Sequence, residues 1–244
     1  MVNLLKLNNI TVTRENKIIL DDISLSINDQ DFIVLVGTNG SGKSSLLNII
    51  NARLKFEQGD ILLNNKNLMK YTAKQLATEI ITLNQSIRDS LFMNLSIWEN
   101  AKLIIQRAWC GQKINKNFRN NLKQYLANFK ENFPNMLNQQ IKFLSGGEQQ
   151  LIAFALYLYH KPKLLLLDEH TSALDPKTAT KLMQVTDKII KQHKITCIMT
   201  THSLDFALQY GNKILAMKNA KIQFQANKKE KHNISKQELL QYCY

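Results

Sequence analysis

A glycine-rich stretch between an apolar run and a helical pattern constrains this chain more than any other feature. Residues 37–44 read GTNGSGKS and fit the pattern G-x-x-x-x-G-K-[ST]. The apolar run DFIVLVG precedes the stretch, and apolar residues at helical spacing follow it at Leu46, Leu47, Ile50 and Leu54. Strand, loop and helix in this order are the context in which the pattern forms a phosphate-binding loop. An ordinary glycine-rich turn would not need that context.

The loop residues have distinct expected roles. Glycines let successive backbone N–H groups curl around phosphate oxygens, and the helix N-terminus adds a partial positive charge. Lys43 is expected to neutralise the β and γ oxygens of a nucleotide, and the Ser44 hydroxyl to bind Mg²⁺. The predicted nucleotide-binding residues of this region are Gly37, Thr38, Asn39, Gly40, Ser41, Gly42, Lys43, Ser44 and Ser45.

Two adjacent carboxylates end a second apolar strand, where residues 164–169 read LLLLDE. Asp168 is expected to hold Mg²⁺, directly or through water, and Glu169 to orient and polarise an attacking water. Strands often end in acidic turns, so the pair is informative only because it lies downstream of a phosphate loop. Together the two motifs predict nucleotide hydrolysis.

A second glycine pair lies in LSGGEQQ at residues 144–150, directly before the apolar helical segment LIAFALYLY. Exposed serine and glycine N–H groups at a helix start form a second anion site. One nucleotide needs only one phosphate cradle. The simplest interpretation is that this second cradle serves the nucleotide held by another subunit.

These motifs together carry a family resemblance. GTNGSGKS, LSGGEQQ, LLLLDE, the SALD sequence at residues 172–175, Gln85 and His202 resemble the nucleotide-binding domain of ABC proteins, in that family's order and over nearly the whole chain. The resemblance implies a Mg²⁺-dependent ATPase whose two subunits pair head to tail. Each ATP would lie between the loop of one subunit and Ser145, Gly146 and Gly147 of the other.

The resemblance also assigns residues that spacing alone would not. Gln85 would touch Mg²⁺ and relay to a membrane domain, and His202 would contact the γ-phosphate and the attacking water. Taken alone, a histidine at a strand end is usually structural. The catalytic set is thus Glu169, His202 and Gln85, and the Mg²⁺ set is Ser44, Gln85 and Asp168. Further nucleotide-binding residues are Glu148 and Asp175.

One position departs from the family pattern. An aromatic residue that stacks on adenine usually stands just before the second strand, and here that position is Arg14. An arginine plane can stack on a base as well, though less strongly than a large aromatic ring. Selectivity for adenine is therefore expected to be lower.

The resemblance extends to a subgroup and its partners. DEHTSALDPKTA and THSLDFALQYGNKILAM look similar to bacterial importer ATPases that work with a separate permease and an extracytoplasmic substrate-binding protein, some of them linked to aromatic amino acids. The rival interpretation is an ABC-type ATPase that acts on nucleic acid or ribosomes. Such proteins usually carry two motif sets or a long coiled coil, whereas this chain has one set with about 100 residues between the loop and LSGGE. A non-catalytic switch is disfavoured by Glu169 and His202.

The predicted fold is α/β: a P-loop core with a mostly parallel sheet, an N-terminal antiparallel β subdomain and an inserted helical subdomain. In the first 28 residues, short strands alternate around a polar turn at Arg14–Lys17. Residues 1–90 and 145–225 are assigned to the core and about 91–144 to the helical insertion, all within one ABC domain, 1–244. The tail, 226–244, is charged and has a helical pattern only at its end, so part of it is expected to be mobile.

Composition bounds the location and partners. The longest apolar run, Leu151 to Tyr159, has nine residues, whereas a membrane-spanning helix needs roughly 20, and the N-terminus lacks a secretory signal pattern. The chain is expected at the cytoplasmic face of the membrane, bound there to its permease. The three cysteines, Cys110, Cys197 and Cys243, form no CxxC pair and indicate neither disulfides nor zinc.

The net charge of +13 comes from 32 basic and 19 acidic residues. Such an excess suits nucleic acid, anionic lipid or nucleotide. Only five of the basic residues are arginines and they are scattered, whereas base-edge and bidentate phosphate recognition favour arginine. An AT-rich genome explains the lysines without any function, and a membrane-surface contribution is the next alternative. No nucleic-acid partner is expected.

An apolar group follows Gln85 in SIRDSLFMNLSIWENA, at Leu91, Phe92, Met93, Leu95, Ile97 and Trp98. One buried helix face does not need so many apolar residues, so some are expected to be exposed. In the ABC family this region receives a short helix of the permease. The alternative is that all six are core residues of the helical insertion.

Overall fold

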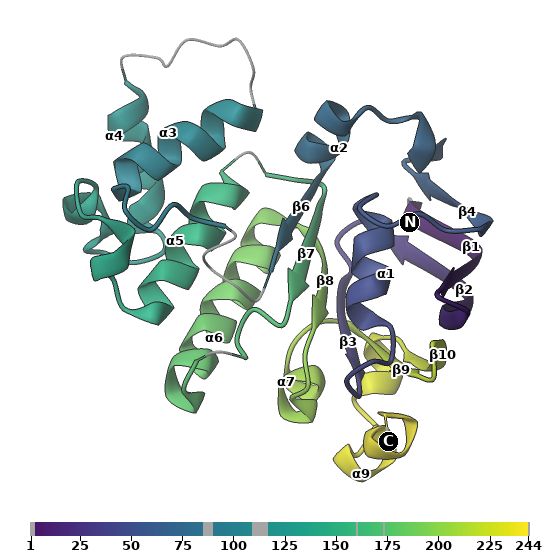
Figure 1. The fold of residues 1–244 in the computed structure, drawn as a ribbon. Coiled ribbons are helices and arrows are strands. Elements are labelled where there is room, and N and C mark those ends of the chain that lie inside the picture. Colours follow the sequence, from purple (N-terminus) through teal and green to yellow (C-terminus); the bar gives the residue numbers. More distant parts are fainter. Residues whose placement is uncertain (1–2, 85–89, 109–116, 160, 173, 244) are drawn as a thin grey trace. The chain divides into compact units, whose positions relative to one another are not determined.

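In this computed structural model, residues 3–84, 90–108, 117–159, 161–172 and 174–243 are described. The chain forms two compact units (Figure 1). The first contains Met1–Thr82, Lys163–Glu169 and Asp187–Tyr244, and the second contains Leu83–Pro162 and His170–Thr186. The helical unit is therefore larger than the predicted insertion, because the helix after LSGGE and the start of the helix at Pro176 belong to it.

Two sheets build the first unit. The antiparallel sheet has the strand order β2-β1-β4-β5, with β1 (Asn3–Arg14), β2 (Lys17–Asn28), β4 (Gln58–Leu63) and β5 (Lys66–Asn67). The other sheet has the order β10-β9-β3-β8-β7-β6, with β3 (Phe32–Gly37), β6 (Ile80–Leu83), β7 (Leu164–Asp168), β8 (Thr196–Thr200), β9 (Lys213–Lys218) and β10 (Lys221–Ala226). Strands β7, β8, β3 and β9 pair in parallel, and β10 pairs antiparallel with β9. The α/β fold with an N-terminal antiparallel sheet is confirmed.

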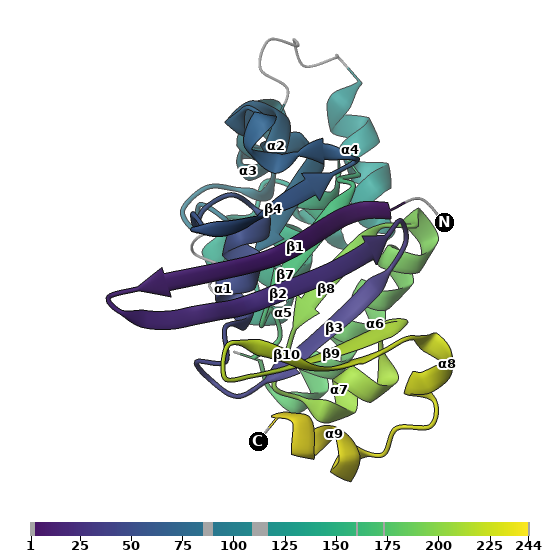
Figure 2. The ribbon, with the colours of Figure 1, turned by 90° about the vertical axis from the view of Figure 1, so that its right-hand side faces the viewer.

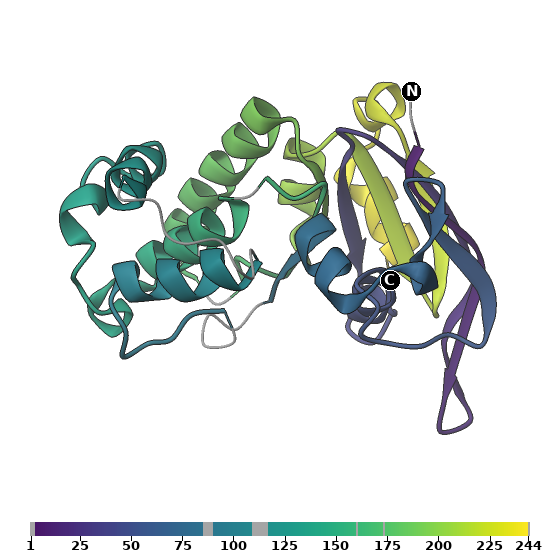
Figure 3. The same ribbon diagram turned by 90° about the horizontal axis from the view of Figure 1, so that it is seen from above.

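Helix α1 (Lys43–Ile50) lies between these two sheets (Figure 3). Its apolar residues Leu46, Leu47, Ile49 and Ile50 are fully buried in one core with residues of both sheets. Strand β3 is buried along its whole length, which explains its unbroken apolar sequence. The helix ends at Ile50 rather than continuing to Leu54, which packs on the same core from the turn beyond.

The predicted turn between the first two strands is confirmed. Glu15 and Asn16 connect β1 to β2 with φ of 48° and 61°, the left-handed pair that suits a two-residue hairpin. Figure 2 shows this long hairpin beside the β9–β10 hairpin. A backbone hydrogen bond of 2.9 Å from the Asp21 amide to the Ala220 carbonyl joins the two hairpins.

The charged tail has more helix than predicted. It forms α8 (Lys228–Lys231) and α9 (Lys236–Cys243), both packed on the first unit. Leu239 and Cys243 are buried, and the buried Lys231 ammonium donates to the carbonyl oxygens of Tyr210 and Gly211. Two apolar side chains and one buried ammonium thus anchor parts of the tail, and its mobility stays a prediction. The unit also contains α2 (Ala73–Glu79), with Thr72 as its N-cap residue, and α7 (Leu204–Gln209).

The second unit is helical, and aromatic side chains pack together in it beside buried aliphatic ones. Its helices are α3 (Ile97–Ala108), α4 (Phe118–Ala127), α5 (Gly146–Leu158) and the first part of α6 (Pro176–His193). The rings of Tyr125 and Tyr159 have centroids 5.1 Å apart, and those of Phe129 and Phe154 are 6.3 Å apart. These contacts fix α4 against α5. Within the described ranges, no helix is both long and apolar enough to cross a membrane.

Candidate functional site

The glycine-rich loop joins β3 to α1 in a conformation that needs its glycines. A Cβ atom at Gly37 would lie 2.2 Å from the Met217 carbonyl oxygen, because β9 passes directly beside the loop. Gly40 has open space around it, yet its φ of 77° favours glycine. Gly42 has a φ of 105° and begins α1, whose first N–H groups have no intrahelical acceptor. Backbone donors are therefore presented at this helix end.

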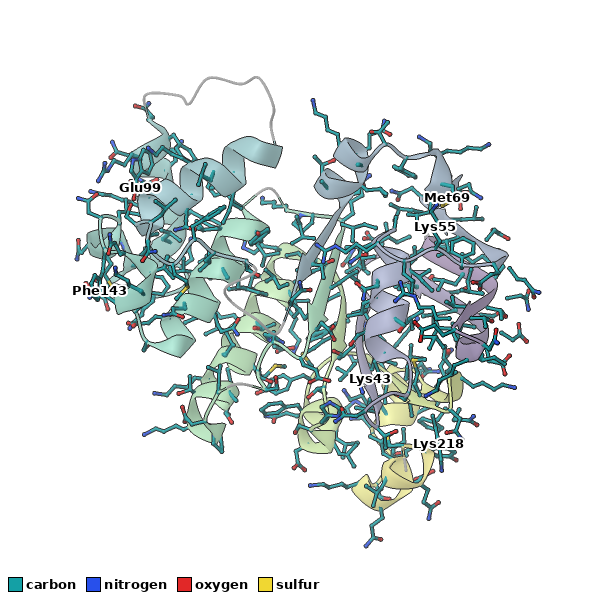
Figure 4. The ribbon with its side chains drawn as sticks, in the orientation of Figure 1. Lys43, Lys55, Met69, Glu99, Phe143 and Lys218 are labelled. Carbon is teal, nitrogen blue, oxygen red and sulfur yellow. The ribbon has the colours of Figure 1, made fainter. Side chains whose placement is uncertain are left out.

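Lys43, labelled in Figure 4, is the first residue of α1, and its ammonium turns back onto the loop. Nζ donates to the carbonyl oxygens of Gly37 and Thr38, each at 2.9 Å. Burial lowers the pKa of Lys43, and the negative charges of Glu169 and Asp168 oppose that shift. The ammonium is thus a cation next to the loop, held by weak neutral acceptors that an anion could replace.

Ser44 and Asp168 meet at the carboxyl ends of β3 and β7. The Ser44 hydroxyl donates to Asp168 Oδ1 at 3.2 Å. The same carboxylate oxygen accepts a second hydrogen bond, of 2.7 Å, from the Thr200 hydroxyl at the end of β8. Thr200 Oγ1 in turn accepts from the Glu169 backbone amide at 3.0 Å. Thr200 therefore holds both carboxylate residues, although it belongs to no recognised motif.

Glu169 and His202 face each other at the same edge of the sheet. His202 Nε2 lies 2.5 Å from Glu169 Oε1, and both side chains are partly exposed. Glu169 has a φ of 48°, which is uncommon for a non-glycine residue, and the hydrogen bond from its backbone amide to the Thr200 hydroxyl fixes that turn. The structure thus brings Lys43, Ser44, Asp168, Glu169 and His202 of the predicted set together in one unit.

The residues present fit a nucleoside triphosphate with Mg²⁺. The Ser41 hydroxyl oxygen in the loop is buried and has no hydrogen-bond partner among the described residues. Such an orphaned group beside a cation and a free helix end suits phosphate oxygens. Ser44 and Asp168 supply the hard oxygen ligands that Mg²⁺ prefers. Gln85, the third predicted Mg²⁺ ligand, lies outside the described residues.

The second cradle, at LSGGE, lies in the helical unit and starts α5. Ser145 is the N-cap residue, and its hydroxyl accepts from the Glu148 amide at 3.4 Å. Glu148 Oε2 accepts from the Ser145 amide and hydroxyl, both at 2.8 Å. A Cβ at Gly147 would lie 2.6 Å from Thr178 Cγ2, so close packing against α6 requires glycine there. The site is a capping box in which a carboxylate holds the serine.

Two predicted nucleotide-binding residues lie at element ends. Asp175 accepts from the Thr178 amide at 3.1 Å, and hydrogen bonds from the Thr178 side chain and then from this amide lower the pKa of its carboxyl group. It therefore caps the start of α6. Arg14 is exposed at the end of β1 and pairs with Lys17 across the hairpin. Contact of either residue with a nucleotide remains a prediction.

The apolar group at residues 91–98 is divided between core and surface. Leu91 and Ile97 are buried, so they are core residues and not part of a docking surface. Phe92 is 55 % exposed, which confirms the expectation that some members face outward. Asn100 fixes this turn, because its side chain accepts from the Phe92 amide at 2.8 Å and donates to the Phe92 and Ser96 carbonyl oxygens at 3.0 Å.

Comparisons with known proteins agree with this geometry. The family profile described as ABC transporter matches residues 20–172. The chain is 33 % identical over 235 residues to a tyrosine transport ATP-binding protein of Clostridioides difficile, covering 93 % of this chain and 91 % of that protein. It is 31 % identical to a spermidine/putrescine import ATP-binding protein of Mycoplasma mycoides, covering 91 % of this chain and 60 % of that protein.

Solved structures show the same fold. CbiO1 from Clostridium perfringens, described as part of the ABC transporter complex cbiONQ, has a TM-score of 0.84 at 26 % identity and covers 99 % of this chain and 94 % of its own. The ATP-binding cassette MJ0796, solved as a dimer in a post-hydrolysis state with ADP and Pi, has a TM-score of 0.77 at 28 % identity, with 92 % and 98 % covered.

Proposed function

The chain belongs to the ABC transporter family, and from this premise we propose that it is the ATP-hydrolysing subunit of a bacterial importer for an amino acid or another small solute. It is an ATPase of that family. A relative named for spermidine/putrescine import supports the direction, and a relative named for tyrosine transport matches nearly the full length of both chains. An aromatic amino acid is the favoured solute.

The observation that carries the chemistry is the contact between Glu169 and His202, 2.5 Å apart beside an Asp168 that two hydroxyls hold. We assign Glu169 the role of orienting and polarising the attacking water. His202 holds that carboxylate in place and lies where it can contact the terminal phosphate. A switch that binds ATP without hydrolysing it would not need this pair.

The loop residues hold the substrate. Residues Gly37 to Ser45 wrap the phosphates, and Lys43 exchanges its two carbonyl acceptors for phosphate oxygens. Ser44, Asp168 and Gln85 would hold Mg²⁺, which when bound neutralises charge on the phosphates. Because Ser44 and Asp168 already share a hydrogen bond, their positions need little change on binding.

The second cradle implies a second subunit. Ser145, Gly146, Gly147 and Glu148 lie at a helix start whose donors suit a phosphate, and the same chain already has one cradle at Lys43. We therefore propose a head-to-tail pair of identical chains in which each LSGGE faces the nucleotide of the other. Asp175 lies in the same helical unit and is assigned to that interface.

The permease partner is proposed to dock on the helical unit around Phe92. Phe143 is 67 % exposed, and Figure 4 shows it at the surface of this unit. The Lys142 amide donates to the Met93 carbonyl at 3.0 Å, so the exposed rings belong to two segments joined by the backbone. Two large exposed apolar side chains on two segments joined in this way suit the apolar face of a permease helix.

These partners place the protein at the cytoplasmic face of the membrane, with a substrate-binding protein on the other side. The experiment that tests the enzymatic part is Glu169→Gln, which keeps the shape of the side chain. This variant should bind MgATP normally, hydrolyse it at least about a hundredfold more slowly, and accumulate as an ATP-bound dimer. Near-normal turnover would remove Glu169 from its role.

A further inference from the structure

The carboxylate of Glu148 raises a problem at the second cradle. The start of α5 is proposed to receive a phosphate, yet Glu148 lies in its first turn with its carboxylate 2.8 Å from the Ser145 hydroxyl. A carboxylate beside a phosphate site repels the incoming anion. Some positive charge must therefore offset it.

Lys130 supplies that charge. Its Nζ lies 2.5 Å from Glu148 Oε1, while Oε2 accepts from the amide and hydroxyl of Ser145. The Lys130 hydrogen bond is the largest of the effects that lower the pKa of Glu148 to about 2. The carboxylate thus has one oxygen on the lysine and the other on the serine.

The position of Lys130 is set by its neighbours in the chain. It follows α4, with its amide bonded to the Leu126 carbonyl at 3.3 Å. The preceding residue, Phe129, is buried against Phe154 of α5, and Nζ lies 5.9 Å from the centre of the buried Phe133 ring. An isolated surface ion pair contributes little to stability, in part because two long side chains lose conformational entropy when it forms. Here the two buried aromatic side chains already restrict Lys130, so less entropy is lost.

A second capping box in the same unit serves as an internal comparison. Ser96 and Glu99 begin α3 with the same contacts, because Glu99 Oε2 accepts from the Ser96 amide at 2.8 Å and from its hydroxyl at 2.7 Å. Hydrogen bonds from Ser96 are the main cause of the lowered pKa of Glu99. Capping a helix in this way does not require a contacting lysine. The lysine at Glu148 therefore serves something other than the cap.

We propose that Lys130 is a positioning residue for ATP-driven dimerisation: it neutralises Glu148, so that Ser145 and the start of α5 can accept a phosphate held by a second copy of this chain. This inference rests on the proposed head-to-tail dimer. When the phosphate arrives, the Ser145 hydroxyl turns its proton from Glu148 to a phosphate oxygen, and Glu148 keeps the Ser145 amide. Throughout this exchange, Lys130 keeps the net charge of the Lys130–Glu148 pair at zero.

The test uses the full chain carrying Glu169→Gln and measures the ATP concentration at half-maximal dimerisation by sedimentation. Lys130→Ala should raise this concentration at least about fivefold, since one uncompensated charge about 4 Å from a phosphate costs on the order of 1 kcal/mol even in water. Lys130→Arg and Lys123→Ala, a change of another exposed lysine of the same unit, should stay within about twofold. Binding of a fluorescent ATP analogue to the monomer, and thermal unfolding, should be unchanged.

A charge-removal variant separates this role from a structural one. Glu148→Gln keeps a capping box, because glutamine also serves at this position. Adding Lys130→Ala to Glu148→Gln should then have no further effect on dimerisation. If Lys130→Ala weakens dimerisation equally in both backgrounds, or behaves like Lys130→Arg, the inference is wrong.

A Ser145→Arg variant distinguishes failure of this inference from failure of the dimer itself. If Ser145→Arg abolishes dimerisation while Lys130→Ala does not change it, only the role of Lys130 is lost. If the Glu169→Gln chain does not dimerise with ATP, or Ser145→Arg dimerises normally, the proposed head-to-tail dimer is lost and the role of Lys130 with it.

Discussion

Thr200→Val should slow ATP hydrolysis although Thr200 belongs to none of the motifs. The side chain is buried, and valine has nearly the same shape but no hydroxyl. The change removes the 2.7 Å bond to Asp168 Oδ1 and the 3.0 Å bond from the Glu169 amide. Asp168 keeps its bond from Ser44, while the turn that places Glu169 loses its anchor.

The size of the effect follows from these two hydrogen bonds. A bond to a charged group contributes about 1.5–3 kcal/mol and a neutral one about 0.5–1.5 kcal/mol, so the free energy of unfolding should fall by about 2–4.5 kcal/mol. A shift of Glu169 by a fraction of an ångström should lower kcat by between about tenfold and a hundredfold. ATP affinity should change much less, because the hydrogen bonds of the Thr200 hydroxyl go to residues 167–169 of β7 and its end, not to Lys43 or its loop.

Thr196→Val is the matched control on the same strand. The Thr196 hydroxyl is also buried, accepts from the Gln30 amide at 2.9 Å and donates to Asp29 at 3.3 Å. Thr196 pairs with Leu164 and Thr200 with Asp168, so the two threonines lie at opposite ends of β8, about 13 Å apart. This control should lose similar stability and keep its kcat.

Steady-state ATPase assays and chemical unfolding on both variants, with Thr200→Ser as a hydroxyl-retaining comparison, measure these effects. Equal loss of kcat in Thr196→Val and Thr200→Val would show that instability, not the position of Glu169, lowers the rate. A kcat for Thr200→Val within twofold of the wild type would refute the reasoning.

Three further predictions concern other parts of the chain. Phe92→Asp should keep ATP binding and lose copurification with the permease, whereas Leu91→Asp should unfold the helical unit because Leu91 is buried. Permease binding by a folded Phe92→Asp chain would contradict the proposed docking surface. Arg14→Tyr should raise the preference for ATP over GTP in competition assays, and unchanged selectivity would mean that another residue contacts the base. Burial lowers the pKa of His170 to about 4, whereas in the unfolded chain this histidine has its ordinary pKa of about 6.5. The unfolded state therefore binds a proton that the folded state does not, and the free energy of unfolding should fall by up to about 3 kcal/mol as the pH drops from about 6.5 to 4. Chemical unfolding of His170→Gln at both pH values should not show this fall.

Local features could be predicted from the sequence because they depend on neighbours in the chain. The strand, glycine loop and helix around Lys43 follow from apolar runs and from the φ values that glycine tolerates. The start of α5 at Ser145 follows from a serine with a glutamate three residues later. The turn at Glu15 and Asn16 is likewise a matter of adjacent residues. The sequence pattern predicted a helix only at the end of the tail, whereas the structure has a second one at Lys228–Lys231, where the Lys231 side chain is buried.

Contacts between distant segments were decided only by the tertiary structure. Thr200 reaches Asp168 because β7 and β8 pair in one particular register, and sequence periodicity does not specify which residues face each other across a sheet. Lys130 reaches Glu148 because Phe129 packs on α5, a choice among many apolar partners. Adjacent apolar residues, buried Leu91 and exposed Phe92, differ because Asn100 fixes the turn between them and the helix. Hydropathy determined that these residues would lie at or near a core, and packing determined which of them remained outside it.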